Sequence, residues 1–397
     1  MLFIAFFLCL GPVVSSLVPT RQASSKEDAR RFQWIQKFAS IGDSYAAGLG
    51  AGSRIDWGCS RYDKSYPHLL QSSLLGDNPH RKHQFLACSG AATPQILESQ
   101  IPFLERDLDL LTISAGGNDI GITPIISDCI YQFFKGGSKD CESAIKEARE
   151  KIAAKDRLYR NVTRVLDAVK PNMNEDRGLI YVTGYAGFFG AEDGLCDNVT
   201  WSVWKDIECD EKKEYLTLKL RKALNELVVE VNDVLREVVE AAGTNVRFID
   251  YDYLIEKNRG RYCEPGIQEP DPNRVELDFY EWATVDSGEN RTEMNNRTGD
   301  DVPKGSFEGD IGERINKTLQ EHPDWEFDPD MGFVNKSKIR EEDWLGDTIH
   351  WLLPDAWKRV FHLRPRGHAL IAKLLLEDLA LRGPGSAEIE EEEQWDL

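Results

Sequence analysis

Short apolar runs recur along the chain, and most of them are followed by a turn rich in Gly or other small residues. These runs lie at residues 37–41, 84–87, 108–114, 179–183 and 246–250. Short, continuous apolar runs of this kind are typical of strands that are buried on both faces of a parallel sheet. The pattern therefore predicts five strands.

Three longer segments place apolar residues at helical spacing. They comprise Leu158, Val162, Val165, Leu166 and Val169; then Leu220, Leu224, Leu227, Val231, Val234 and Val238, with Gly243 as a candidate C-cap; and finally Ile371, Leu374, Leu375 and Leu379. Strands that alternate with amphipathic helices predict an α/β protein in which helices cover both faces of a parallel sheet.

The same pattern divides the chain into six segments. Residues 1–16 form an apolar leader with small residues at its end, which predicts a signal peptide, and residues 17–35 form an N-terminal extension. Residues 36–263 and 343–383 carry the periodic core. Between them, at residues 264–342, Pro, Gly, Asp, Glu and Asn dominate, so we expect an insertion that acts as a partly ordered flap. Residues 384–397 form an acidic tail.

Charge and glycosylation motifs narrow the setting in which the protein acts. With 48 basic and 68 acidic residues the formal net charge is −20, which argues against nucleic acid as a partner. Beyond the leader no apolar stretch is long enough to anchor the chain stably in a membrane. Asn-x-Ser/Thr acceptor motifs predict a secreted, extracellular glycoprotein, and they begin at Asn161, Asn198, Asn290, Asn296, Asn316 and Asn335.

Small-residue turns that carry polar groups follow the first three predicted strands. They are Gly42-Asp43-Ser44, Cys88-Ser89-Gly90 and Gly117-Asn118-Asp119, and Gly367-His368 follows near the C-terminus. Ligands of open parallel sheets collect at the carboxyl ends of the strands. A serine, backbone N–H donors, a side-chain amide and a histidine are the groups that acyl transfer requires.

In this order, the four blocks resemble the GDSL-type SGNH hydrolases. The surrounding residues 38–48, 87–91 and 361–368 are similar to the secreted esterase and lipase branch of that family, in a fungal-type version. The resemblance implies a three-layer α/β/α, flavodoxin-like fold with a five-stranded parallel sheet and a long polar insertion before the C-terminal helix.

The resemblance also implies a role for each matching residue. Ser44 is then the nucleophile and His368 the catalytic base. The backbone N–H groups of Ser44 and Gly90 and the side-chain amide of Asn118 form the oxyanion hole. A glycine at position 90 allows the backbone to approach the substrate closely.

The third member of the triad departs from the family pattern. Many relatives carry Asp three residues before the histidine, and Pro365 stands at that position here. We favour a backbone carbonyl, that of Pro365, as the group that orients His368, because ring orientation is the essential task. The alternative is a carboxylate from the end of the insertion, namely that of Asp343, Asp347 or Asp355.

No other motif predicts a metal or a cofactor. Gly48-x-Gly50-x-Gly52 lacks the final glycine of a dinucleotide fingerprint, because Ser53 follows. A solvated turn is the better interpretation of His80 and His83. His350 and His362 have no third ligand at metal spacing, so we interpret them as structural.

Seven cysteines remain when Cys9 in the leader is left out, and none shows C-x-x-C spacing. We therefore expect most of these cysteines to form disulfide bonds. Cys59 and Cys88 lie at the same edge of the predicted sheet and are expected to pair, and Cys129 pairs locally with Cys141. The match to the family pairs Cys196 with Cys263 and leaves Cys209 over; a local bond between Cys196 and Cys209 is the alternative.

Together these features predict a secreted serine esterase or lipase that cleaves carboxylic esters through an acyl-serine intermediate. Its substrate would be a lipid, a polyester similar to cutin or suberin, or an acylated polysaccharide. Two alternatives stay open: a carbohydrate acetyl esterase of the same fold, and a non-catalytic binding protein or effector that kept the scaffold.

Overall fold

The computed structural model describes residues 31–76, 78–131, 140–154, 157–201, 213–281, 283–286, 320–328, 332–335 and 358–382. The predicted signal peptide, most of the insertion and the acidic tail lie outside these ranges. So do Cys209 and the three acceptor residues Asn290, Asn296 and Asn316.

A five-stranded parallel sheet forms the centre of the molecule, in the order β4-β1-β5-β6-β7. Its strands are β1 (Lys37–Gly42), β4 (Lys82–Phe85), β5 (Leu110–Ser114), β6 (Leu179–Thr183) and β7 (Val246–Ile249). This is the flavodoxin-like order, so the predicted fold class is confirmed. Only β4 is displaced, by two residues, from its apolar run; as an edge strand it admits polar residues such as Lys82 and His83.

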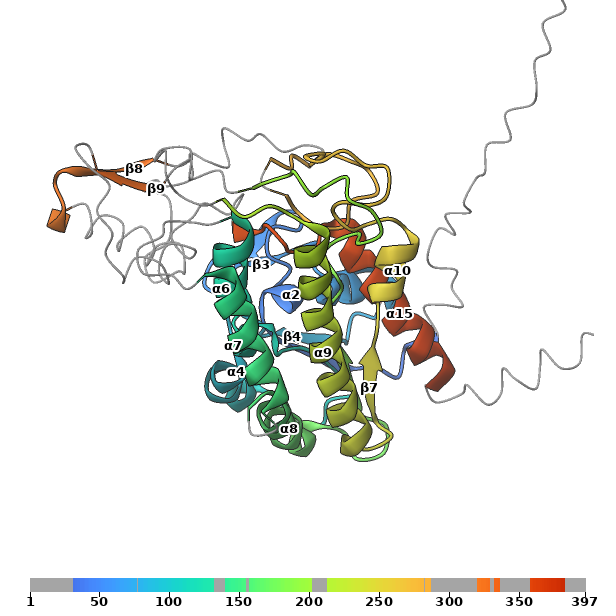
Figure 1. Ribbon diagram of the computed structural model, residues 1–397. Helices are drawn as coiled ribbons and strands as arrows, with labels where there is room; N and C mark the ends of the chain where they lie inside the picture. The colour runs from blue at the N-terminus through green and yellow to red at the C-terminus, as the bar shows by residue number, and fades with distance from the viewer. Residues whose placement is uncertain are drawn as a thin grey trace, which may run out of the picture.

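Helices cover both faces of this sheet (Figure 1). The α-helices are α2 (Ser44–Ala47), α3 (Tyr66–Leu69), α4 (Thr93–Ser99), α5 (Gly117–Ile120), α6 (Ile122–Ile126), α7 (Cys141–Ala153), α8 (Leu158–Val169), α9 (Leu218–Ala242), α10 (Asp252–Lys257) and α15 (Pro365–Arg382). Single turns of π-helix are η1 (Leu70–Leu74) and η3 (Ser127–Tyr131), and single turns of 3₁₀-helix are η2 (Ile101–Phe103) and η4 (Lys170–Asn172). Two small antiparallel hairpins are formed by β2 (Arg54–Asp56) with β3 (Arg61–Tyr62) and by β8 (Trp325–Asp328) with β9 (Gly332–Asn335). Helices α4, α8 and α9 pack together on one face, and α3 packs with α15 on the other.

The apolar positions that predicted these elements form the core. Every residue of β5 is buried, as a strand covered on both faces must be. On α8 the stripe of Leu158, Val162, Val165, Leu166 and Val169 is buried, while the residues between are more exposed. Burial of such a stripe, at roughly 1.5–3 kcal/mol for each large apolar side chain, is the main stabilisation of an amphipathic helix in a protein.

The first part of the expected insertion packs into the core rather than forming a flap. Leu277, Phe279 and Tyr280 are almost fully buried. Tyr280 N donates to His362 O (2.9 Å), and Phe361 N donates to Tyr280 O (3.0 Å). The boundary that we expected at residue 264 is therefore too early. The sequence analysis missed this segment because its few apolar residues show neither the helical period nor a long apolar run.

Three disulfides join Cys59 to Cys88, Cys129 to Cys141 and Cys196 to Cys263. All three predicted pairs are confirmed, and the alternative bond from Cys196 to Cys209 is excluded. The first bridge ties the loop after β1 to the turn after β4, where Ser89 N donates to Cys59 O (3.0 Å). It therefore fixes the turn that carries Gly90.

Three acceptor residues for glycosylation lie within the described ranges. Asn198 is exposed, and Asn335 ends β9. Asn161 is half-buried on α8, and its amide nitrogen, the atom that would carry a glycan, donates to Asp119 Oδ1 (3.2 Å). Glycosylation stays a prediction, and Asn198 offers the more accessible amide of the two whose side chains are described.

Candidate active site

Ser44 lies where β1 ends and α2 begins, at the carboxyl edge of the sheet. Gly42 has φ 134°, and a Cβ there would come within 2.2 Å of the Ser114 carbonyl oxygen of β5. Asp43 caps α2, since its Oδ1 accepts the backbone N–H of Tyr45 (2.9 Å). The tight turn and the cap together fix Ser44 as the first helical residue.

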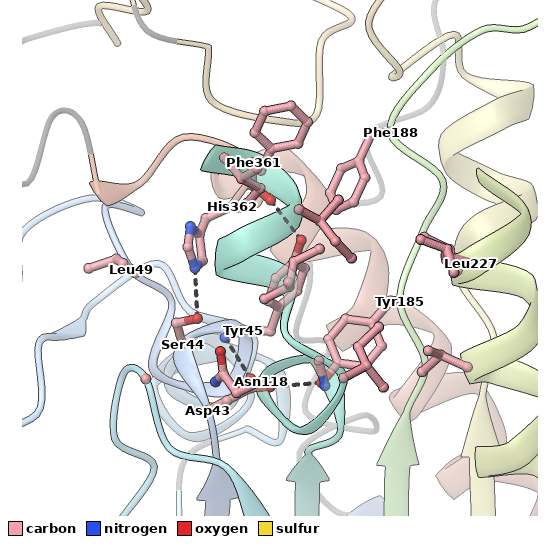
Figure 2. A pocket seen from close by; sticks show the side chains of 18 of the residues that line it. Asp43, Ser44, Tyr45, Leu49, Asn118, Tyr185, Phe188, Leu227, Phe361 and His362 are labelled. Atoms are coloured by element: carbon pink, nitrogen blue, oxygen red, sulfur yellow. Dashed lines mark hydrogen bonds between the residues drawn. The ribbon is translucent and has the colours of Figure 1, made fainter. Parts of the chain in front are cut away.

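The side chain that meets Ser44 is His362. Its Nε2 lies 2.6 Å from Ser44 Oγ (Figure 2). Its Nδ1 lies 3.2 Å from the carbonyl oxygen of Val360. The preceding residue, Phe361, has φ 64°, which costs energy for a residue with a side chain. The Tyr45 hydroxyl donates to the Phe361 carbonyl (2.7 Å) and helps to hold this turn.

His368, which the sequence suggested as the base, is placed elsewhere. It lies in the first turn of α15, is 1 % exposed, and its Nδ1 accepts the backbone N–H of Tyr66 at 3.4 Å. It falls on the buried stripe of that helix with Ile371 and Leu375. The expectations that His368 contacts Ser44 and that His362 is merely structural are therefore both wrong.

The orienting group changes with the histidine. A backbone carbonyl does face Nδ1, as we favoured, but it belongs to Val360. Pro365 instead begins α15. The alternative carboxylates, those of Asp343, Asp347 and Asp355, lie outside the described residues.

Burial keeps the His362 imidazole in its neutral form. It lowers the pKa of His362 to about 4, against a smaller opposing effect of backbone hydrogen bonds, chiefly with Val360. The ring is therefore neutral near pH 7. A neutral ring that donates its Nδ1–H to Val360 O presents an unprotonated Nε2 to Ser44, as a general base requires.

Asp43, next to the nucleophile, is 2 % exposed. Burial raises the pKa of its carboxyl to about 7, although hydrogen bonds from the Tyr185 hydroxyl and from Tyr45 N oppose the shift. The Tyr185 hydroxyl donates to Asp43 Oδ2 at 2.7 Å. These two donors favour the charged, helix-capping form of the carboxyl.

Gly90 and Asn118 line the same cavity as Ser44. Gly90 has φ 84°, a conformation that glycine adopts without strain. The Asn118 amide donates one hydrogen to Ala91 O (3.0 Å), which fixes the side chain while the amide group keeps a second hydrogen. The groups expected to stabilise the oxyanion thus line the same cavity as Ser44.

The cavity beyond Ser44 is strongly apolar. It is open to solvent and lies between η3 with α6 on one side and α9 on the other; its empty space, with the solvent-filled opening included, is about 1060 Å³. In Figure 2, Phe188 and Leu227 lie across the cavity from Ser44 and His362. Its apolar lining includes Ile120, Ile122, Ile125, Ile126, Ile130, Phe188, Leu224, Leu227, Val228, Val231 and Phe361.

Neither a candidate metal site nor a candidate membrane-spanning helix is found among the residues that the structure describes. No group of three or more His, Cys, Asp or Glu residues in this part of the chain is arranged to hold a metal ion. In the same ranges, no helix combines the length and the apolar character needed to cross a membrane.

A serine hydroxyl that contacts an imidazole, at the carboxyl edge of a flavodoxin-like sheet and beside Gly and Asn donors, has the arrangement of a serine hydrolase. The sequence model of the GDSL-like Lipase/Acylhydrolase family matches residues 40–269. The chain belongs to this family. His362 lies beyond the matched residues, so its assignment depends on the structure.

The chain is similar to two curated lipases. A lipase of Streptomyces rimosus is 33% identical over 169 residues, which are 42% of this chain and 58% of the relative. Lipase 1 of Streptomyces coelicolor is 36% identical over 97 residues, or 24% of this chain and 35% of the relative. The chain thus spans less than two thirds of either relative.

Among solved structures, an extracellular lipase from Streptomyces rimosus is 26% identical and aligns with a TM-score of 0.46 over 59% of this chain and 86% of its own. A phospholipase A1 from Streptomyces albidoflavus is 24% identical, with a TM-score of 0.41 over 53% of this chain and 78% of its own.

Proposed function

We propose that the protein hydrolyses carboxylic esters through an acyl-serine intermediate. The observation that carries the proposal is the 2.6 Å contact between Ser44 Oγ and His362 Nε2. In the first half of the reaction Ser44 Oγ attacks the ester carbonyl carbon while His362 Nε2 accepts the hydroxyl proton. The imidazolium then returns this proton to the leaving alcohol as the carbon–oxygen bond breaks.

The second half of the reaction repeats these proton transfers with water. His362 Nε2 accepts a proton from water, whose oxygen attacks the acyl carbon, and then donates the proton to Ser44 Oγ as the free acid leaves. In both halves the carbonyl oxygen becomes negative. The N–H groups of Ser44 and Gly90 and the amide of Asn118 would stabilise it, each contributing about 3 kcal/mol.

The apolar cavity favours a lipid or polyester with a long acyl chain over an acetylated glycan. An acetyl group would leave most of the cavity empty. Each additional methylene that is buried there contributes about 0.8 kcal/mol. The three disulfides support an oxidising, extracellular setting. The fungal-type branch of the family stays a prediction.

The nucleophile can be tested with a fluorophosphonate probe, which labels activated serines covalently. We expect the wild-type protein to be labelled at Ser44 and the Ser44→Ala variant to resist both labelling and ester hydrolysis. A folded wild-type protein that resists the probe and hydrolyses no ester would contradict the proposal. Equal labelling of Ser44→Ala would show that another serine reacts.

The acyl-chain preference can be tested at α9, where Leu227 lines the cavity and is 3 % exposed. We expect wild type to prefer p-nitrophenyl octanoate over the acetate. Leu227→Phe should narrow the cavity and lower kcat/KM for the octanoate about tenfold, with the acetate rate nearly unchanged. Val229→Phe, on the outer side of the same helix where Val229 is 52 % exposed, is the matched control. A wild-type preference for the acetate would favour the acetyl esterase alternative.

A further inference from the structure

Tyr185 lies two residues beyond the end of β6, at the carboxyl edge of the sheet, and is 7 % exposed. Its hydroxyl makes two hydrogen bonds that point to different loops. It donates to Asp43 Oδ2 (2.7 Å) and accepts the backbone N–H of Gly117 (3.0 Å). Asp43 immediately precedes Ser44, and Gly117 immediately precedes Asn118. Figure 2 shows Tyr185 beside Asp43 and Asn118.

The backbone of Tyr185 is itself fixed from α9. Tyr185 N donates to Asn232 Oδ1 (2.9 Å), and Asn232 Nδ2 donates to Tyr185 O (2.8 Å). Asn232 is 5 % exposed, so this pair of bonds is shielded from water. The Tyr185 ring also packs edge-on against Tyr45, with 5.2 Å between the ring centroids. The hydroxyl therefore has little freedom to move.

We propose that Tyr185 is a positioning residue for the ester hydrolysis proposed above, whose hydroxyl holds the Ser44 turn and the Asn118 turn at one fixed separation. Donors stabilise a developing oxyanion only if they are already in place when charge develops. The N–H of Ser44 and the amide of Asn118 come from the turns that follow two different strands, β1 and β5, and must converge on one oxygen. The Tyr185 hydroxyl bonds to the residue before each of them.

Close approach at Gly117 supports this role. A Cβ at Gly117 would lie 3.3 Å from both the hydroxyl oxygen and Cζ of Tyr185, so the ring packs directly on the loop. Without the hydroxyl, the Gly117 N–H would lose its partner and Asp43 would keep one donor fewer. Both loops could then relax away from the arrangement that the transition state requires.

The test is the Tyr185→Phe variant, which keeps the ring and removes only the hydroxyl. With p-nitrophenyl acetate we expect kcat to fall by roughly 10- to 100-fold while KM changes less than about twofold, because the loss falls on the transition state. The matched control is Tyr181→Phe. The Tyr181 side chain is also buried, on β6, and its hydroxyl donates to Asp378 Oδ2 (2.8 Å) of α15, remote from both loops. Its kcat should stay within about twofold of wild type.

A double-variant cycle separates positioning from general stability. If Tyr185 acts through the oxyanion donors, its effect on kcat should shrink when Asn118→Ala is already present. If Tyr185→Phe fails to fold, Asn232→Ala carries the test, since it frees the Tyr185 backbone and should lower kcat at nearly constant KM.

Four results would overturn the proposal: unchanged kcat in folded Tyr185→Phe, a loss no larger than that of Tyr181→Phe, a change confined to KM, or full additivity with Asn118→Ala. If Tyr185→Phe does not fold, an unchanged kcat in the Asn232→Ala variant overturns the proposal as well. A folded wild-type protein that hydrolyses no ester would instead overturn this proposal and the proposed function together. The two failures are therefore distinguishable.

Discussion

Substitution of His362 and of His368 offers the sharpest test of the site, because the two variants should lose different properties. His362→Ala removes the imidazole whose Nε2 lies 2.6 Å from Ser44 Oγ. His368→Ala removes a buried imidazole whose contact is with the backbone of Tyr66. We expect the first variant to lose activity and keep its stability, and the second to lose stability and keep its activity.

The magnitudes follow from the two environments. A general base contributes about 10²- to 10⁴-fold, and loss of the base of a serine–histidine pair reaches the upper end or beyond, so His362→Ala should lower kcat at least about 10³-fold. His368 is 1 % exposed, and truncating a buried ring leaves a cavity that costs about 3 kcal/mol. For a domain of this size that lowers Tm by roughly 4–5 °C.

Both variants are measured alongside wild type at 25 °C, with p-nitrophenyl ester hydrolysis for activity and thermal unfolding for Tm. His368→Ala should retain kcat within a few-fold while it is folded. If folded His368→Ala were inactive and His362→Ala active, the assignment of the base to His362 would be refuted.

Two further predictions concern the donors and the base. Asn118→Ala should lower kcat about 10²- to 10³-fold with little change in KM, since its amide acts on the oxyanion; steady-state kinetics that show an effect on KM alone would remove Asn118 from the oxyanion hole. Burial lowers the pKa of His362 to about 4, so the imidazole stays neutral at pH values well below the ordinary pKa of histidine. As the pH falls, kcat/KM should therefore drop to half only near pH 4. An acid limb centred near pH 6.5, measured where the protein is folded, would contradict this protonation state.

Much of the fold is encoded locally and could be predicted. The apolar runs specify the strands, and the stripe on α8 appears in the structure at the same positions. The turn at Gly42 and Ser44 could also be recognised, because only glycine tolerates the close approach to β5. The disulfide between Cys59 and Cys88 could be predicted from the order of the strands, since both cysteines follow strands at the same edge of the sheet.

Two residues of the site, His362 and Tyr185, were missed by the sequence analysis for different reasons. His362 was missed because His368 was chosen in its place. His368 could have been rejected, because it continues the buried helical stripe of Ile371 and Leu375 and so faces the core rather than the serine turn. Tyr185 showed no signal, since it follows its strand without a motif. Its role depends on hydrogen bonds to Asp43 and Gly117, which follow two other strands, β1 and β5.

The local pattern and the order of neighbouring strands were enough to predict the five strands, the long helices α8, α9 and α15 and two of the disulfides. The third disulfide, Cys196–Cys263, was predicted from the family resemblance. Which imidazole reaches Ser44 depends on the tertiary structure. That contact joins residues 318 positions apart. It depends on Tyr280, whose backbone bonds to Phe361 and His362 turn the final loop toward the serine. A contact set by pairing between distant segments leaves no periodic trace in either of them.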